Sequence, residues 1–111
     1  MLLLHRNPGS RLLDPDSAAT TASKLRLISI DRPGYGSTDP VSDPTAAAPS
    51  SDIVDVVGEL GLEDVALIGS GSGLFALAAA ASLGQRLRSL SLVCTLHPMT
   101  RSPRCPMTSA L

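Results

Sequence analysis

The residues best suited to chemistry lie at positions 69–73, which read Gly-Ser-Gly-Ser-Gly. An apolar run precedes them and an alanine-rich segment follows, so the pattern predicts a strand, a tight turn and a helix. A serine at such a turn projects above the edge of a sheet, where a substrate can reach its hydroxyl. The chemistry would be nucleophilic attack by Ser70, which we favour over Ser72. In the alternative, both serines only cap the following helix.

A nucleophilic serine needs a histidine to take its proton and a carboxylate to orient that histidine. The chain has two histidines, His5 and His97. We expect a structural role for His5, which leaves His97, just past the last expected strand, as the alternative base. The last acidic residue is Asp64, so no carboxylate follows the serines. The sequence therefore predicts little or no catalytic turnover by this chain.

The elements that must position these serines alternate along the chain. Apolar runs predict strands at residues 2–4, 25–30, 65–68 and 90–94. Capping residues and apolar spacing predict helices from Asp14 to about Lys24, from residue 51 or 52 to Leu60, and from Leu74 to Leu83. Strands that alternate with helices favour an α/β fold, a mostly parallel sheet with helices on both faces.

Two further segments follow the first two expected strands. Residues 5–10 read His-Arg-Asn-Pro-Gly-Ser and residues 31–37 read Asp-Arg-Pro-Gly-Tyr-Gly-Ser. With the serine turn, and over roughly residues 2–94, they make the chain resemble the α/β-hydrolase family from its oxyanion loop to its nucleophile elbow. Arg6 stands where that family has glycine, and the elbow is one residue shorter before Ser70.

The resemblance implies a partial α/β-hydrolase fold that cleaves a small-molecule ester or amide through Ser70. It also implies an oxyanion hole formed by the backbone N–H groups of Asn7 and Gly71. We assign Arg32 and Tyr35 to turn structure, and we expect no cofactor and no metal.

Two other functions remain open. The first is a non-catalytic, truncated scaffold or binding protein. The second is a nucleotide-binding module, suggested by the Gly-x-Gly-x-Gly spacing at residues 69–73. Against it, Leu74 stands where the dinucleotide fingerprint needs a small residue. We divide the chain into a partial hydrolase domain at 1–94 and a disordered tail at 95–111, where prolines interrupt a polar stretch.

Composition excludes several classes of partner. The chain has 111 residues, Lys+Arg 9, Asp+Glu 10 and a net charge of −1, which predicts no binding to nucleic acid or anionic membranes. No apolar run reaches the roughly 20 residues that span a bilayer. Cys94 and Cys105 do not form a zinc-binding motif, and they do not indicate an oxidising compartment. We therefore expect a cytoplasmic protein. Self-association through open sheet edges is the remaining expected contact.

Overall fold

The computed structural model describes residues 1–42 and 47–93, and the expectations for Cys94, His97 and the segment 95–111 lie outside this part. Its strands are β1 (Leu2–Leu4), β2 (Ile28–Ile30), β3 (Val65–Ser70) and β4 (Leu87–Val93). Its helices are α1 (Ser17–Ala22), α2 (Ala47–Glu59) and α3 (Gly73–Leu83), with the short 3-10 helix η1 (Gly84–Arg86) before β4.

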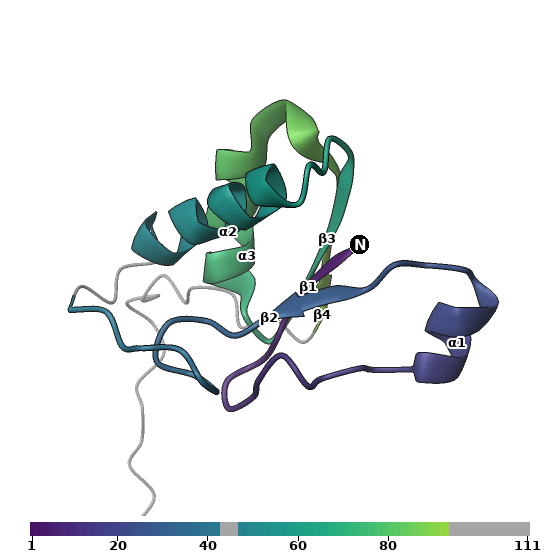
Figure 1. Ribbon diagram of the computed structural model, residues 1–111, viewed down its shortest axis with the longest axis horizontal. Coiled ribbons are helices and arrows are strands. Elements are labelled where there is room, and N and C mark those ends of the chain that lie inside the picture. The colour runs from purple at the N-terminus through teal and green to yellow at the C-terminus, as the bar shows by residue number, and fades with distance from the viewer. Residues whose placement is uncertain (43–46, 94–111) are drawn as a thin grey trace, which may run out of the picture.

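The strands form one sheet in the order β2-β1-β3-β4, and every neighbouring pair is parallel. This confirms the expected α/β class. Helices α2 and α3 cover one face of the sheet, while α1 lies on the other side at the end of a long excursion (Figure 1). A hollow of about 200 Å³ separates α1 from the sheet, between Ala19 and Thr20 of the helix and Leu3 and Ile68 of the strands.

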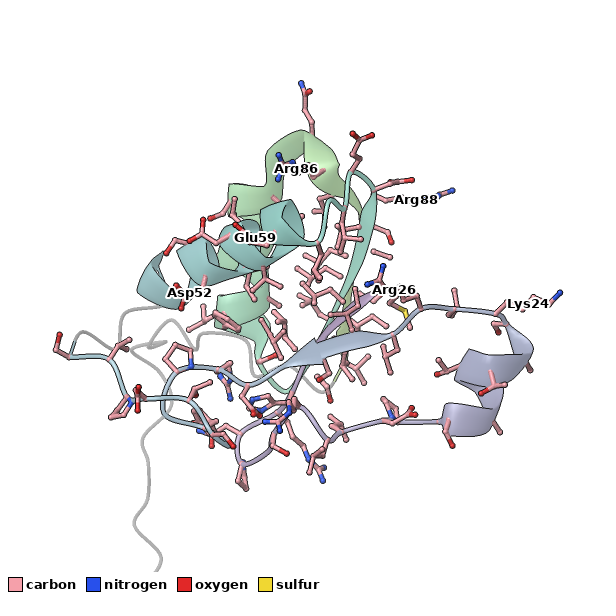
Figure 2. All side chains as sticks on the ribbon, viewed as in Figure 1. Lys24, Arg26, Asp52, Glu59, Arg86 and Arg88 are labelled. Carbon is pink, nitrogen blue, oxygen red and sulfur yellow. The ribbon has the colours of Figure 1, made fainter. Side chains whose placement is uncertain are left out.

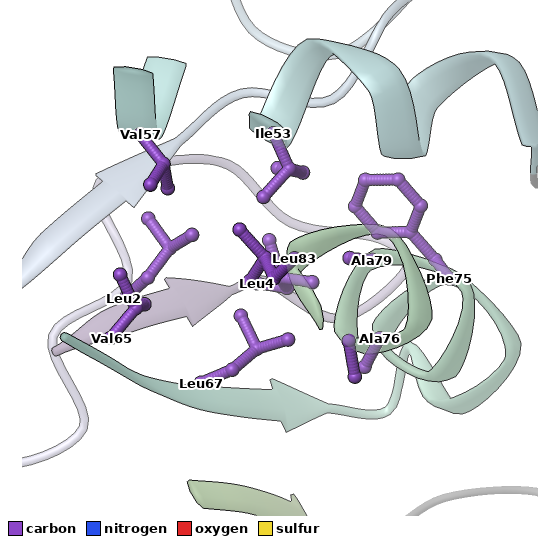
Figure 3. Packing of buried hydrophobic residues seen from close by; sticks show 11 residues of the cluster. Leu2, Leu4, Ile53, Val57, Val65, Leu67, Phe75, Ala76, Ala79 and Leu83 are labelled. Atoms are coloured by element: carbon purple, nitrogen blue, oxygen red, sulfur yellow. The ribbon is translucent and has the colours of Figure 1, made fainter. Parts of the chain in front are cut away.

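The core fills the space between the two central strands and helices α2 and α3 (Figure 3). Leu2 and Leu4 of β1 and Val65 and Leu67 of β3 are all at most 2% exposed. They pack against side chains from both helices, which are Ile53, Val57, Phe75, Ala76, Ala79, Ala80 and Leu83. Burial of these apolar groups is the main force that holds the helices on the sheet.

Helix α2 shows the predicted amphipathic pattern. Ile53 and Val57 are fully buried against the sheet, while Asp52 and Glu59 point away from it (Figure 2). Leu60, which we expected on the apolar face, lies past the helix end and is 42% exposed. Gly61 follows with a φ of 62°, the left-handed conformation predicted for the helix stop.

Four predicted boundaries are wrong. Helix α1 begins at Ser17 because Asp16, rather than Asp14, is its N-cap and accepts a hydrogen bond from the N–H of Ala19 at 2.9 Å. Strand β2 is only the last half of the expected strand, since pairing with the three-residue β1 limits its length. Helix α2 begins at Ala47, four residues before the expected start, and β4 begins at Leu87, three residues before it. The remaining limits differ from prediction by two residues or fewer, as is usual for helix and strand ends.

No helix in the described part of the chain is long and apolar enough to cross a membrane. Within residues 1–42 and 47–93, no group of three or more His, Cys, Asp or Glu side chains could hold a metal ion.

Candidate functional site

The order of the strands defines where a ligand would bind. From β1 the chain crosses to β2 on one side through α1, and from β3 it crosses to β4 on the other side through α3. The connections that leave the adjacent strands β1 and β3 therefore diverge. In open parallel sheets, the crevice at the carboxyl ends of two such strands is the usual binding site. In this protein it is formed by the loop after β1 and the turn after β3.

The turn after β3 has glycine at its apex. Gly71 has a φ of 64°, and it joins the last residue of β3 to Ser72, the N-cap of α3. The chain thus passes from strand to helix through one residue of positive φ, a conformation that glycine adopts without steric cost. However, the residue in the left-handed conformation carries no side chain and no hydroxyl.

Ser70 lies on the side of the sheet away from α3. Along β3, alternate residues are buried, and a side chain at Gly69 would collide with Cβ of Ala76 in α3 at 2.5 Å. Because successive strand residues point to opposite faces, Ser70 faces the side of α1. Among the described residues, no side-chain hydrogen bond joins Ser70 to a base. The structure therefore places the expected nucleophile beside the apex rather than on it.

The hydroxyl of Ser72 holds two elements together. Ser72 is 6% exposed, and its Oγ donates a hydrogen bond to the backbone carbonyl of Leu4 at 3.2 Å. This bond ties the start of α3 to the end of β1. The side chain of Ser72 makes no capping hydrogen bond to α3. The alternative prediction, that this serine caps the helix with its hydroxyl, is therefore wrong.

One of the two expected oxyanion donors already has a partner within the sheet. The N–H of Gly71 donates to the carbonyl of Val93 at 2.8 Å and so belongs to the pairing of β3 with β4. Asn7 is exposed, in the loop after β1. An oxyanion hole needs donors aimed at the reacting oxygen, and the N–H of Gly71 is directed at the sheet instead.

His5 is part of the framework, as the sequence predicts. It is fully buried at the end of β1. Its Nδ1 lies 2.8 Å from the carbonyl of Arg6, and the backbone N–H of Arg32 donates to its Nε2 at 3.3 Å. We therefore assign the hydrogen of the ring to Nδ1, which leaves no free ring nitrogen to accept a proton from a serine.

Arg32 has a larger role than the turn structure predicted for it. Its guanidinium carbon lies 4.6 Å from the ring centre of Tyr35 and 5.7 Å from that of Phe75. Both distances are within the range of cation–π attraction. Nε and Nη2 of Arg32 are buried, and neither has a hydrogen-bond partner within residues 1–42 and 47–93. Tyr35 also packs edge-on against His5, with ring centres 5.3 Å apart.

Asp31 anchors the loop after β2. Its side chain is 2% exposed and pairs with the guanidinium of Arg11. Its carboxylate also accepts the backbone N–H of Arg11 at 2.6 Å. These bonds, led by the one from the Arg11 backbone and joined by one from the backbone of Ser37, hold the pKa of Asp31 below its usual value despite the opposing effect of burial. Gly36 lies against this carboxylate, where a Cβ would meet Oδ2 of Asp31 at 2.3 Å.

A half-open hollow of about 310 Å³ adjoins these groups, between the loop after β2 and the first half of α2. Its walls are mainly apolar and include Ile30, Pro33, Val41, Ile53, Val56 and Phe75. Arg32, Thr38 and three carboxylates, those of Asp31, Asp39 and Asp52, also line it. The hollow is large enough for a small organic molecule, at the lower end of the usual range of about 300–1,000 Å³ for ligand sites.

Linear sequence patterns do not predict this hollow, because its walls come from three separate segments of the chain. The available signal was the placement of Arg32 directly after a buried strand, next to the prolines and glycines of its turn. No protein-family model matches the sequence, and no curated protein matches it significantly.

Proposed function

We propose that this chain is a non-catalytic binding protein built on an α/β-hydrolase-like sheet. The observation that carries the proposal is the position of Gly71 at the apex of the turn after β3. A serine hydrolase has its nucleophile at that position, and glycine offers none. The two neighbouring serine hydroxyls are not at this position. Ser72 donates a hydrogen bond to the carbonyl of Leu4, and Ser70 lies on the face of the sheet toward α1.

The ligand that suits the proposal is a small, mainly apolar molecule. The hollow beside Arg32 has mainly apolar walls, and its polar lining groups are Arg32, Thr38 and the carboxylates of three aspartates. Such sites bind by excluding water from apolar surface and take their specificity from the few polar groups. The site adjoins the carboxyl end of β2, which is the edge of a parallel sheet where ligands bind.

Hydrolysis by Ser70 is the second candidate. The strand, sharp turn and helix around residues 65–83, together with the two loop motifs that precede them, favour it. For this reaction Ser70 would have to reach a base.

An esterase assay separates the two. We expect the purified chain to hydrolyse p-nitrophenyl acetate no faster than a solution of an unrelated protein, and to take no label from a fluorophosphonate probe. Ser70→Ala and Ser72→Ala should leave both readings unchanged. Turnover that disappears in Ser70→Ala alone would contradict the proposal and establish the hydrolase.

Binding is tested directly with indole as an apolar probe. Chemical-shift changes should map to Ile53, Val56 and Phe75 on titration with millimolar indole. Val56→Trp should abolish them by filling the hollow. Leu60→Trp is the matched control, since Leu60 is 42% exposed at the end of the same helix. Equal shifts in wild type and Val56→Trp would show that indole binds elsewhere.

A further inference from the structure

The side chain of Arg32 has two buried hydrogen-bond donors that no described group accepts. They are the nitrogens Nε and Nη2. These two nitrogens form one edge of the planar guanidinium, and the N–H groups of that edge point in the same direction. A buried donor without a partner is costly, and the cost is higher when the group is charged. The edge therefore suits an acceptor that offers two oxygen atoms in one plane.

The positive charge of Arg32 also lacks a counter-charge in the described part of the chain. No carboxylate of residues 1–42 and 47–93 forms an ion pair with it. The rings of Tyr35 and Phe75 attract the guanidinium, but they provide no oxygen to accept its N–H groups. A bound anion would supply both the missing charge and the missing acceptors.

The hollow beside Arg32 has room for the rest of such an anion. Arg32 and Phe75 both line it, and its walls are mainly apolar. Among the described residues of the lining, Arg32 is the only cation. One guanidinium balances one negative charge, which favours a carboxylate over a phosphate group with a charge of about −1.5 to −2.

The three aspartates of the lining do not cancel this preference. The carboxylate of Asp31 is paired with the guanidinium of Arg11. Asp39 and Asp52 are exposed, so water and salt weaken their effect on a bound anion. The unpaired charge that is buried in the described lining is therefore positive.

We propose that the hollow binds a small carboxylic acid with an apolar body, and that the Nε–Nη2 edge of Arg32 binds both oxygens of its carboxylate. The inference rests on the proposed binding function and adds the chemical class of the ligand. Protein atoms cover Nε and Nη2, so the carboxylate reaches them after side chains of the wall rotate. Such rotations are common on binding. The apolar body then lies against Ile53, Val56 and Phe75.

Phenylacetate and phenylacetamide test the inference, because the two compounds have nearly the same shape and differ in charge. In chemical-shift titrations of the full chain at pH 7, we expect phenylacetate to bind about tenfold more tightly than phenylacetamide. Val56→Trp should abolish the binding of both by filling the hollow. Equal affinities that are both lost in Val56→Trp would overturn the carboxylate assignment and leave the proposed binding function intact. Failure of both compounds to bind would contradict the binding function as well.

Variants of Arg32 test whether its free edge selects the carboxylate. Arg32→Met should bind the two compounds equally. Arg32→Lys retains the charge but has no edge of two nitrogens, so most of the preference for phenylacetate should be lost. Arg88→Met is the matched control and should keep the preference of wild type, since Arg88 is paired with Asp64 on the exposed surface. An undiminished preference in Arg32→Lys or Arg32→Met would overturn the proposal.

Discussion

The backbone N–H of Arg32 donates a hydrogen bond to Nε2 of His5 over 3.3 Å, and this bond joins the ends of β1 and β2. His5 is fully buried, and its other ring nitrogen lies 2.8 Å from the carbonyl of Arg6. The histidine thus provides hydrogen-bond partners for two backbone groups, the carbonyl of Arg6 and the N–H of Arg32, which lie in loops beyond the paired strands. Its imidazole is a structural bridge at the edge of the crevice.

His5→Ala should destabilise the fold by about 2–4 kcal/mol, because it leaves a cavity and two backbone groups without their partner. The measurement is the free energy of unfolding from urea titrations. Arg6→Ala is the control, since it retains the carbonyl that faces His5 and should change stability by less than about 0.5 kcal/mol. Equal losses in the two variants would argue against the bridge.

Ser72→Ala should lower the free energy of unfolding by about 1 kcal/mol, because it removes the hydrogen bond from a buried hydroxyl to the carbonyl of Leu4. Ser70→Ala should have an effect below about 0.5 kcal/mol, since no hydrogen bond of that side chain is lost. Thermal or urea unfolding of both variants provides the comparison. A larger loss in Ser70→Ala than in Ser72→Ala would reverse the assignment of the structural serine.

Gly71→Ala should destabilise the chain by about 1–2 kcal/mol, because its φ of 64° is unfavourable for any residue with a Cβ. Gly58→Ala makes the opposite change within α2, where the nearest atom to a new Cβ is Nη1 of Arg86 at 3.7 Å. There alanine should stabilise the helix by about 0.5–1 kcal/mol. A neutral Gly71→Ala variant would show that the turn can relax to negative φ.

Asp31→Asn should destabilise the protein at pH 7, and the difference from wild type should shrink in acid. The pKa of Asp31 in the folded chain lies below its usual value of 3.8. Its ionised form therefore stabilises the fold above that value, and the contribution is lost as the pH falls through the folded-state pKa. Unfolding of both proteins from pH 7 down to pH 3 measures this. Asp55→Asn, on the exposed side of α2, should show no such convergence.

The sequence predicted the elements better than the site. Apolar runs and helical spacing located the described strands and helices α2 and α3, because burial in a parallel sheet selects those residues directly. Capping residues located α1, and the 3-10 helix η1 was not predicted. The start of α1 was misplaced because Asp14 and Asp16 can both cap a helix, and only the hydrogen bond from Ala19 decides between them. Propensity at a helix end cannot resolve such neighbours.

The candidate site depends on relations that a linear pattern does not contain. Ser70 was favoured by residue type, while the backbone dihedral that defines the apex belongs to Gly71. Arg32 was assigned to its turn because its contact with Phe75 arises only when α3 packs near the loop after β2. Residue identity constrains local conformation, and the site is formed by tertiary packing.

The hydrogen bond from Gly71 to Val93 holds the turn after β3 on the outer strand. A change in the backbone of β4 therefore reaches this turn directly. The turn is only as rigid as the edge strand that holds it.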